Sequence, residues 1–267
     1  MALRKWIAAA AMSAVTISIS QPAIAAEAAK PTVYTFGTLR TAPAEQAKAK
    51  AAEWLGSIGR MDAGAFEKIW ANESRSVFDR TIDSLLLGST EAEAMLLDAR
   101  NPDAMPPMSV PSIIKDVKNN DFFRANIATA YAKALSSKRV YEEALEALKS
   151  VRAEFVVEPS AFFFYKAVAE HATIQKELAN GSIVRLLDDV ADAPDRYKMV
   201  ATLMFFDMQN WSADQKDLAN IGRLMDNSGR RLDLARGGPQ TQDIQKKIVF
   251  RLDEKIKELE NQAKGGA

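Results

Sequence analysis

The chain has 267 residues, of which 48% are hydrophobic and 26% charged, and it contains one histidine and no cysteine. This composition is typical of a globular protein rather than a disordered or collagen-like chain. The absence of cysteine excludes disulfides, thiol nucleophiles and cysteine-ligated metals. Lysine and arginine exactly balance aspartate and glutamate at 35 each, whereas general nucleic-acid binding requires a basic surface. We therefore expect no cofactor, no metal and no nucleic-acid partner.

The start of the chain has the three parts of a secretory signal peptide. Arg4 and Lys5 form a short positive region, an uncharged run extends to Ser20, and an Ala-Ile-Ala box ends at Ala25. The uncharged run is short for a membrane span of about 20 residues, so we expect cleavage between Ala25 and Ala26 rather than an uncleaved anchor. No later segment has the length and apolarity of a transmembrane helix. The expected product is a periplasmic or secreted protein without stable membrane insertion.

Hydrophobic spacing predicts an all-α fold. Residues 26–100 contain successive helix-type patterns and form an irregular N-terminal helical region. The one alternating run lies within residues 27–41, and a lone strand is not stable, so we expect an extended arm there. Four prolines within 101–112 predict a linker.

Three helical hairpins are predicted within residues 113–236, followed by a charged helix over 239–263. The hairpins begin near Asp121, Pro159 and Asp195, and the spacings of 38 and 36 residues are typical of solenoid repeats. Gly and Pro residues around 237–239 end the last hairpin.

The first hairpin carries a recognisable signature. It consists of small and aromatic residues at helix-compatible spacing: Ala128, Tyr131, Tyr141, Ala144 and Leu145. This pattern resembles the tetratricopeptide repeat, with an insertion of about four residues in the turn. The second and third hairpins keep the length but not the signature. The resemblance implies a stacked helical scaffold that binds proteins or peptides, of a kind similar to uncharacterised exported bacterial proteins.

The C-terminal helix has one apolar seam at coiled-coil spacing, formed by Val249, Leu252, Ile256 and Leu259. The seam is shorter than the three to four heptads of a sustained coiled coil. A repeat stack has to cover its last hydrophobic face, so we expect the helix to fold back as a cap. The expected contact residues are Leu218, Ile221 and Met225. Self-association through the seam is the alternative.

Catalytic patterns are sparse. Ser112 and Lys115 fit the S-x-x-K motif of penicillin-binding enzymes, but the S-D-N and K-T-G elements are missing. His171 lies mid-helix among apolar neighbours without an H-E-x-x-H partner, and we expect it to pack. We therefore assign no catalytic residue and expect a non-enzymatic interaction scaffold whose partner is a protein or peptide. The alternative is an envelope-acting hydrolase or transferase that uses Ser112, Lys115 or His171.

Two charged clusters have simple structural interpretations. The acidic cluster comprises Asp188, Asp189, Asp192 and Asp195, and its spacing differs from that of a calcium loop. We interpret it as a solvated helix end. The basic cluster comprises Arg223, Arg230, Arg231 and Arg236. We interpret it as a salt-bridged, solvent-facing helix side, with contact to an acidic partner as the alternative.

The signal-peptide interpretation predicts a processed protein. N-terminal sequencing of the protein recovered from the producing cells should begin near Ala26 or Glu27. Recovery of an intact Met1 form in the membrane fraction would contradict it.

Overall fold

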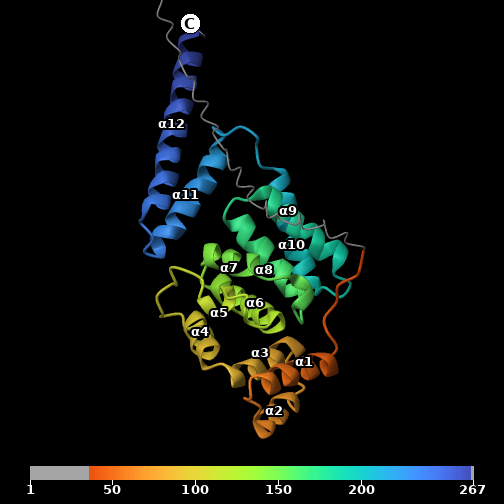
Figure 1. Cartoon of the computed structure of the whole chain (residues 1–267). Coiled ribbons are helices and arrows are strands. Elements are labelled where there is room, and N and C mark those ends of the chain that lie inside the picture. Colours follow the sequence, from red (N-terminus) through yellow and green to blue (C-terminus); the bar gives the residue numbers. More distant parts are fainter. Residues whose placement is uncertain (1–35, 266–267) are drawn as a thin grey trace, which may run out of the picture. The chain divides into compact units, whose positions relative to one another are not determined.

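The computed structural model describes residues 36–265 (Figure 1). The chain divides into two units, Met1–Val33 and Tyr34–Ala267, and every described residue belongs to the second. The predicted cleavage site at Ala25 and Ala26 and most of the predicted arm lie outside the described residues. Within the described part there are twelve α-helices and no strand, which confirms the all-α prediction. No helix in this part is long and apolar enough to cross a membrane.

Four helices precede the proline-rich segment: α1 (Ala44–Ser57), α2 (Ala63–Trp70), α3 (Val77–Gly88) and α4 (Thr90–Arg100). The last three each begin where a side chain accepts a hydrogen bond from a backbone N–H of the first turn, which satisfies one otherwise unpaired donor. The capping residues are Asp62, Ser76 and Ser89. α1 packs on α3, and both α3 and α4 pack on α6 (Asp121–Ser137).

Two successive hairpins form the middle of the fold. The first joins α6 to α7 (Tyr141–Lys149), and the second joins α8 (Pro159–Ala172) to α9 (Lys176–Val184). A 3₁₀ turn, η1 (Ala153–Phe155), lies between them, and α9 continues into a π-helical turn, η2 (Arg185–Asp189). α8 packs against both α6 and α7. The hairpins are therefore stacked side by side.

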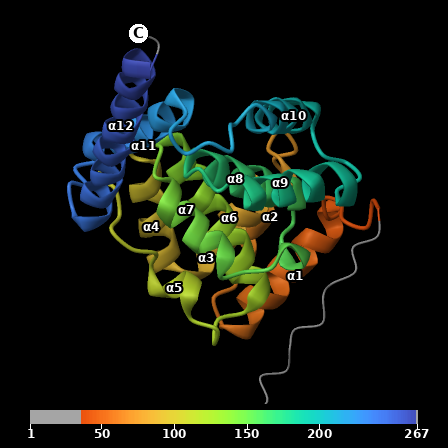
Figure 2. The ribbon, with the colours of Figure 1, turned by 90° about the horizontal axis from the view of Figure 1, so that it is seen from above.

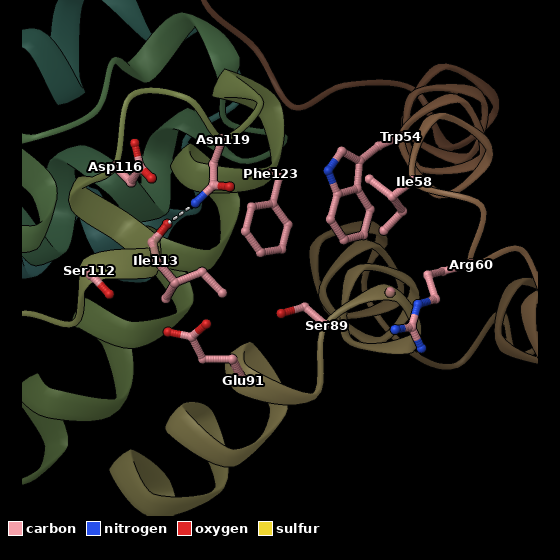
Figure 3. A pocket seen from close by; sticks show the side chains of 11 residues that line it. Trp54, Ile58, Arg60, Ser89, Glu91, Ser112, Ile113, Asp116, Asn119 and Phe123 are labelled. Carbon is pink, nitrogen blue, oxygen red and sulfur yellow. Dashed lines mark hydrogen bonds between the residues drawn. The ribbon is translucent and has the colours of Figure 1, made fainter.

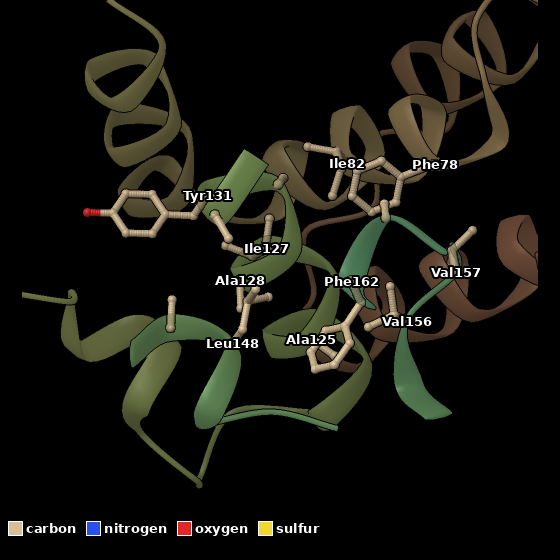
Figure 4. Packing of buried hydrophobic residues seen from close by; sticks show 14 of the residues in the cluster. Phe78, Ile82, Ala125, Ile127, Ala128, Tyr131, Leu148, Val156, Val157 and Phe162 are labelled. Carbon is tan, nitrogen blue, oxygen red and sulfur yellow. The ribbon is translucent and has the colours of Figure 1, made fainter. Parts of the chain in front are cut away.

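α6 is the central helix of the core. Thirteen of its side chains are buried, as expected for a helix that is apolar on all sides. Figure 4 shows α6 between Phe78 and Ile82 of α3 on one side and Leu148 of α7 on the other. One hydrophobic cluster includes buried residues from α1 through α10, so the proline-rich segment joins two parts of one core.

The signature residues are packing positions. Ala128, Tyr131, Ala144 and Leu145 are buried, and both alanines are completely inaccessible. They lie on α6 and α7, which pack on each other. Tyr141 is half-buried and lies under the guanidinium of Arg230, 5.2 Å from its ring centroid.

The predicted third hairpin is wrong. α10 (Asp195–Gln209) packs on α8 and α9, whereas α11 (Leu218–Asp233) packs on α12 (Pro239–Gly265). The third hairpin is therefore α11–α12, and α10 is a single helix at the end of the stack. Figure 2 shows α10 well apart from α11 and α12.

The three hairpins close with the same turn. Each has a non-glycine residue in the left-handed region two residues after the first helix ends: Arg139, Ile174 and Ala235, with φ of 61°, 62° and 57°. The next residue donates its N–H to the carbonyl five residues earlier, as in a Schellman motif. These bonds join Val140 to Leu135, Gln175 to Glu170 and Arg236 to Arg231. This conformation favours glycine, but none of the three residues is a glycine. The sequence therefore does not mark these turns.

A buried ion-pair network attaches the α11–α12 hairpin to α7. Arg230 donates to both carboxylate oxygens of Glu142 at 2.6 and 2.9 Å, and Arg231 adds a third bond at 2.5 Å. Arg236 pairs with Glu143 at 2.8 Å and donates to the carbonyl of Pro107 at 2.6 Å. All three arginine side chains are less than a tenth exposed, so the predicted solvent-facing position is wrong for them.

The fourth member of the basic cluster, Arg223, stacks over Trp211 at 4.6 Å from the ring centroid.

The acidic cluster is partly structural. Asp189 is buried and pairs with Arg185 at 3.0 Å, and the carboxylate of Asp192 accepts the N–H of Thr41. Leu39 forms a parallel bridge with Val190, so the chain before α1 lies along this segment. The predicted solvated position is wrong for Asp189, whereas Asp188, Asp192 and Asp195 are exposed. No acidic or histidine group in the described part is arranged to hold a metal.

The predicted cap does not form with the expected residues. Val249, Ile256 and Leu259 are each more than half exposed, and Leu252 is intermediate. Leu218 and Met225 are also exposed, and Ile221 is the one expected contact residue that is buried. α12 turns a different side to α11, with Thr241 and Ile248 buried. The Arg231 Nε–Thr241 Oγ1 bond at 2.8 Å helps to set this rotation.

The network predicts acid-sensitive stability. Burial raises the pKa of Glu142, but the hydrogen bonds and charge of Arg230 and the bond from Arg231 outweigh this and lower the pKa from 4.5 to about 2. A depressed pKa means that the unfolded chain binds more protons, so this contribution is complete above pH 4.5 and is lost as the pH falls towards 2. Glu142→Gln should cost about 3 kcal/mol at pH 7, because it leaves buried guanidinium groups without a counter-charge. Urea unfolding at pH 7 and pH 3 checks this.

The matched control is Glu146→Gln on the same helix. Glu146 pairs with Lys115, and both side chains are about half exposed. This exposed pair should contribute less than about 1 kcal/mol. The variant Glu142→Gln should also lose less stability than the parent between pH 7 and pH 3. Equal unfolding midpoints for the parent and Glu142→Gln at pH 7 would disprove the role of the network.

Candidate functional site

A groove of about 430 Å³ lies among α1, the α3–α4 junction, α5 (Ser112–Lys115) and the start of α6. We call it the Trp54 groove. Its side chains come from four separate stretches of the chain and are shown in Figure 3: Trp54, Ile58, Arg60, Ser89, Glu91, Ser112, Ile113, Asp116, Asn119 and Phe123. Its size lies in the range of pockets that hold small ligands or peptide side chains.

The apolar wall of the groove is a pair of stacked rings. Trp54 of α1 and Phe123 of α6 lie 4.5 Å apart between centroids, with 10° between their planes. Gly88, the last residue of α3, makes room for the indole, because a Cβ there would lie only 2.5 Å from the Trp54 ring. Ile58 follows the last residue of α1, one turn after Trp54, and is exposed. Both rings are buried and only their edges line the groove, so Ile58 is the accessible apolar side chain of this wall.

The polar residues of the groove are held by short local hydrogen bonds. Ser89 caps α4 by accepting the N–H of Ala92 at 3.1 Å, and Asn119 donates to the carbonyl of Ile113 at 3.0 Å. The charged lining consists of Arg60, Glu91 and Asp116. Two carboxylates against one guanidinium favour a neutral or cationic ligand over an anionic one.

Ser112 and Lys115 are not brought together in this groove. Ser112 lines it, whereas Lys115 is absent from its lining and pairs with Glu146 of α7. Pro111 precedes the first residue of α5, so the S-x-x-K pattern coincides with a short helix that starts after a proline. The carboxylates that line the groove together with Ser112 are those of Glu91 and Asp116.

His171 belongs to a different cavity, of about 290 Å³, near the ends of α8 and α10. Its Nε2 lies 2.9 Å from a carboxylate oxygen of Asp207, and the Trp211 indole N–H donates to the same oxygen at 3.0 Å. Burial raises the pKa of Asp207, but the bonds from His171 and Trp211 outweigh it and hold the pKa below its usual value. The ring of His171 also lies 5.5 Å from that of Trp211. The side chain of His171 therefore makes a hydrogen bond to Asp207 in addition to its ring contact with Trp211.

A buried serine, Ser182, and a partly buried lysine, Lys166, also meet between α8 and α9. Lys166 donates to Glu170 at 2.6 Å and to Ser182 at 2.8 Å, and Ser182 donates to Glu170 at 2.5 Å. Glu170 is completely buried, and a buried charge needs this kind of pairing. The cluster joins the two helices of the second hairpin.

Sequence reasoning did not identify the groove. Trp54 and Phe123 each lie on an apolar helical stripe, and Gly88 lies at a helix end. None of these local patterns indicates that the three residues meet.

Comparison of the chain with protein-family models, curated proteins and solved structures finds no match.

The contact between Gly88 and Trp54 predicts the effect of a single methyl group. Gly88→Ala should displace the indole and cost about 1–3 kcal/mol through overpacking, with a change in tryptophan fluorescence. Gly229→Ala in α11 is the control, because a Cβ there meets nothing within 4 Å, and it should be neutral or stabilising by up to about 1 kcal/mol. If chemical denaturation shows the same stability for both variants, the described packing of α1 on α3 is incorrect.

Proposed function

We propose that this chain is an exported, non-enzymatic interaction scaffold that binds a segment of another protein in the Trp54 groove. The observation that carries the proposal is an aromatic wall with a polar rim, built on helices that share one core. Binding sites of this kind combine an apolar anchor surface with a few fixed polar groups. Export is supported by the signal-type start, and a periplasmic or extracellular location follows from it.

The helical arrangement supports a scaffold of tetratricopeptide-like type. Two hairpins stack side by side, and the two signature alanines of the first hairpin are buried. The stack differs from a regular solenoid because α10 has no hairpin partner and α11 pairs with α12. We propose the repeat relationship for the first two hairpins only.

The lining favours one kind of partner segment. An apolar side chain can lie beside Ile58 and the edge of Trp54, and a neighbouring lysine or arginine can approach Glu91 and Asp116. Binding rather than catalysis is supported because neither Lys115 nor His171 lines the groove that contains Ser112. The proposed ligand is therefore a peptide segment with an apolar residue next to a basic one.

Site-specific crosslinking in the producing cells tests the proposal. A photoreactive residue at Ile58 should crosslink to a defined protein, whereas one at Val117 should not, because Val117 is exposed outside the groove. A peptide from the crosslinked segment should then bind the purified chain. Ile58→Asp with Glu91→Arg should weaken that binding at least about tenfold, through loss of apolar contact and charge reversal.

The control is Val117→Asp with Glu93→Arg, which makes the same changes at exposed positions outside the groove. Equal binding by the groove variant and this control would overturn the proposal. Labelling of Ser112 by a serine-reactive probe with turnover would replace it with the hydrolase or transferase alternative.

A further inference from the structure

The α11–α12 hairpin has one apolar face that nothing in the described chain covers. Six large side chains on it are about half exposed or more: Leu218, Met225, Leu232, Val249, Ile256 and Leu259. We call this set the hairpin face. It includes three of the four residues of the seam that the sequence predicts. Single exposed apolar residues are ordinary, but a contiguous apolar face on a surface indicates an interaction site.

The two helices contribute to the same side of the hairpin. Bonds between Arg231 and Thr241 and between Lys216 and Glu258 set the antiparallel register, which brings Leu218 level with Ile256. Met225 lies about 40° around α11 from the buried Ile221, and Val249 lies about 100° around α12 from the buried Ile248, in the same rotational sense. In an antiparallel pair, equal senses of rotation lead to the same side. The six residues therefore form one face that spans both helices.

We propose that a second copy of this chain packs on the hairpin face, so that the two hairpins form a four-helix bundle about a two-fold axis. A two-fold contact uses the same patch on both copies. Four-helix bundles bury apolar rows of this kind between hairpins. The Arg–Glu network holds the C-terminal end of α11 against α7. In this position no other element of the described chain covers the hairpin face.

The charges on α12 favour this occupant. Residues 239–251 carry three basic groups and one acidic group, and residues 252–265 carry four acidic and three basic groups. A two-fold axis across the bundle makes each α12 antiparallel to its copy, so the basic half of one helix faces the acidic half of the other. Charge complementarity of this type selects partner and orientation.

The size of the face suits a dimer contact. α11 has 16 residues, which is about 24 Å of helix, and two helices side by side are about 20 Å wide. The footprint is therefore about 500 Å² on each copy, or about 1,000 Å² in total, which reaches the lower bound for a specific interface.

Sedimentation of the purified chain over a range of concentrations tests the proposal. The parent should form a dimer, and Met225→Asp with Val249→Asp should weaken dimerisation by about 100-fold or more, because it places unpaired charges in the contact. Both positions are exposed, so circular dichroism should show an unchanged helical fold. Raised salt should weaken the parent dimer through the α12 charges.

The control is Leu203→Asp with Phe206→Asp, which makes the same change on the exposed apolar stripe of α10. This variant should remain dimeric. A parent that stays monomeric at every concentration would overturn the proposal. A dimer that the α10 variant disrupts and the hairpin variant does not would also overturn it, because the contact would then lie at the open end of the stack.

Discussion

The ion pairs of Glu142 and Glu143 fix the position of the C-terminal α11–α12 hairpin. Their carboxylates lie at the start of α7 and are paired with three arginines about 90 residues later, within and just after α11. Removing one partner of such a pair leaves an uncompensated buried charge. The C-terminal hairpin is therefore held against α7 and the proline-rich segment, and it cannot also lie on α10. This attachment explains why α10 has no hairpin partner and why the hairpin face is uncovered.

The two interaction surfaces that we propose are separate. The Trp54 groove is built from α1, α3, α4, α5 and α6, and the hairpin face is built from α11 and α12. They share no element, and each lies on helices that are packed or ion-paired into the fold. Partner binding in the groove and pairing through the hairpin face are compatible on these grounds, and two copies would present two grooves in one assembly.

The three hairpins share one turn but are not evenly spaced along the chain, so they differ from a regular repeat. Each closes through a left-handed residue and the same hydrogen bond, although the residues are Arg, Ile and Ala. The first two turns are separated by one repeat length, whereas α10 and the following loop lie between the second and third. The prediction from evenly spaced hairpin starts therefore paired the α11 segment with α10, whereas it packs on α12. A glycine at these positions would have marked the turns in the sequence.

The sequence alone determined what depends on local periodicity: the all-α class, most helix positions, the buried signature alanines and the apolar seam of α12. The missing S-D-N and K-T-G elements led only to the expectation that Ser112 is not catalytic. Only the tertiary structure decided that Trp54, Gly88 and Phe123 meet, and that Arg230, Arg231 and Arg236 are buried against Glu142 and Glu143. These contacts join residues far apart in the chain, and their local patterns equally fit a core stripe or a solvent-facing salt-bridged helix. The rotation of α12 was decided in the same way, because one long-range ion-pair network and the bond to Thr241 select which side of an amphipathic helix is buried.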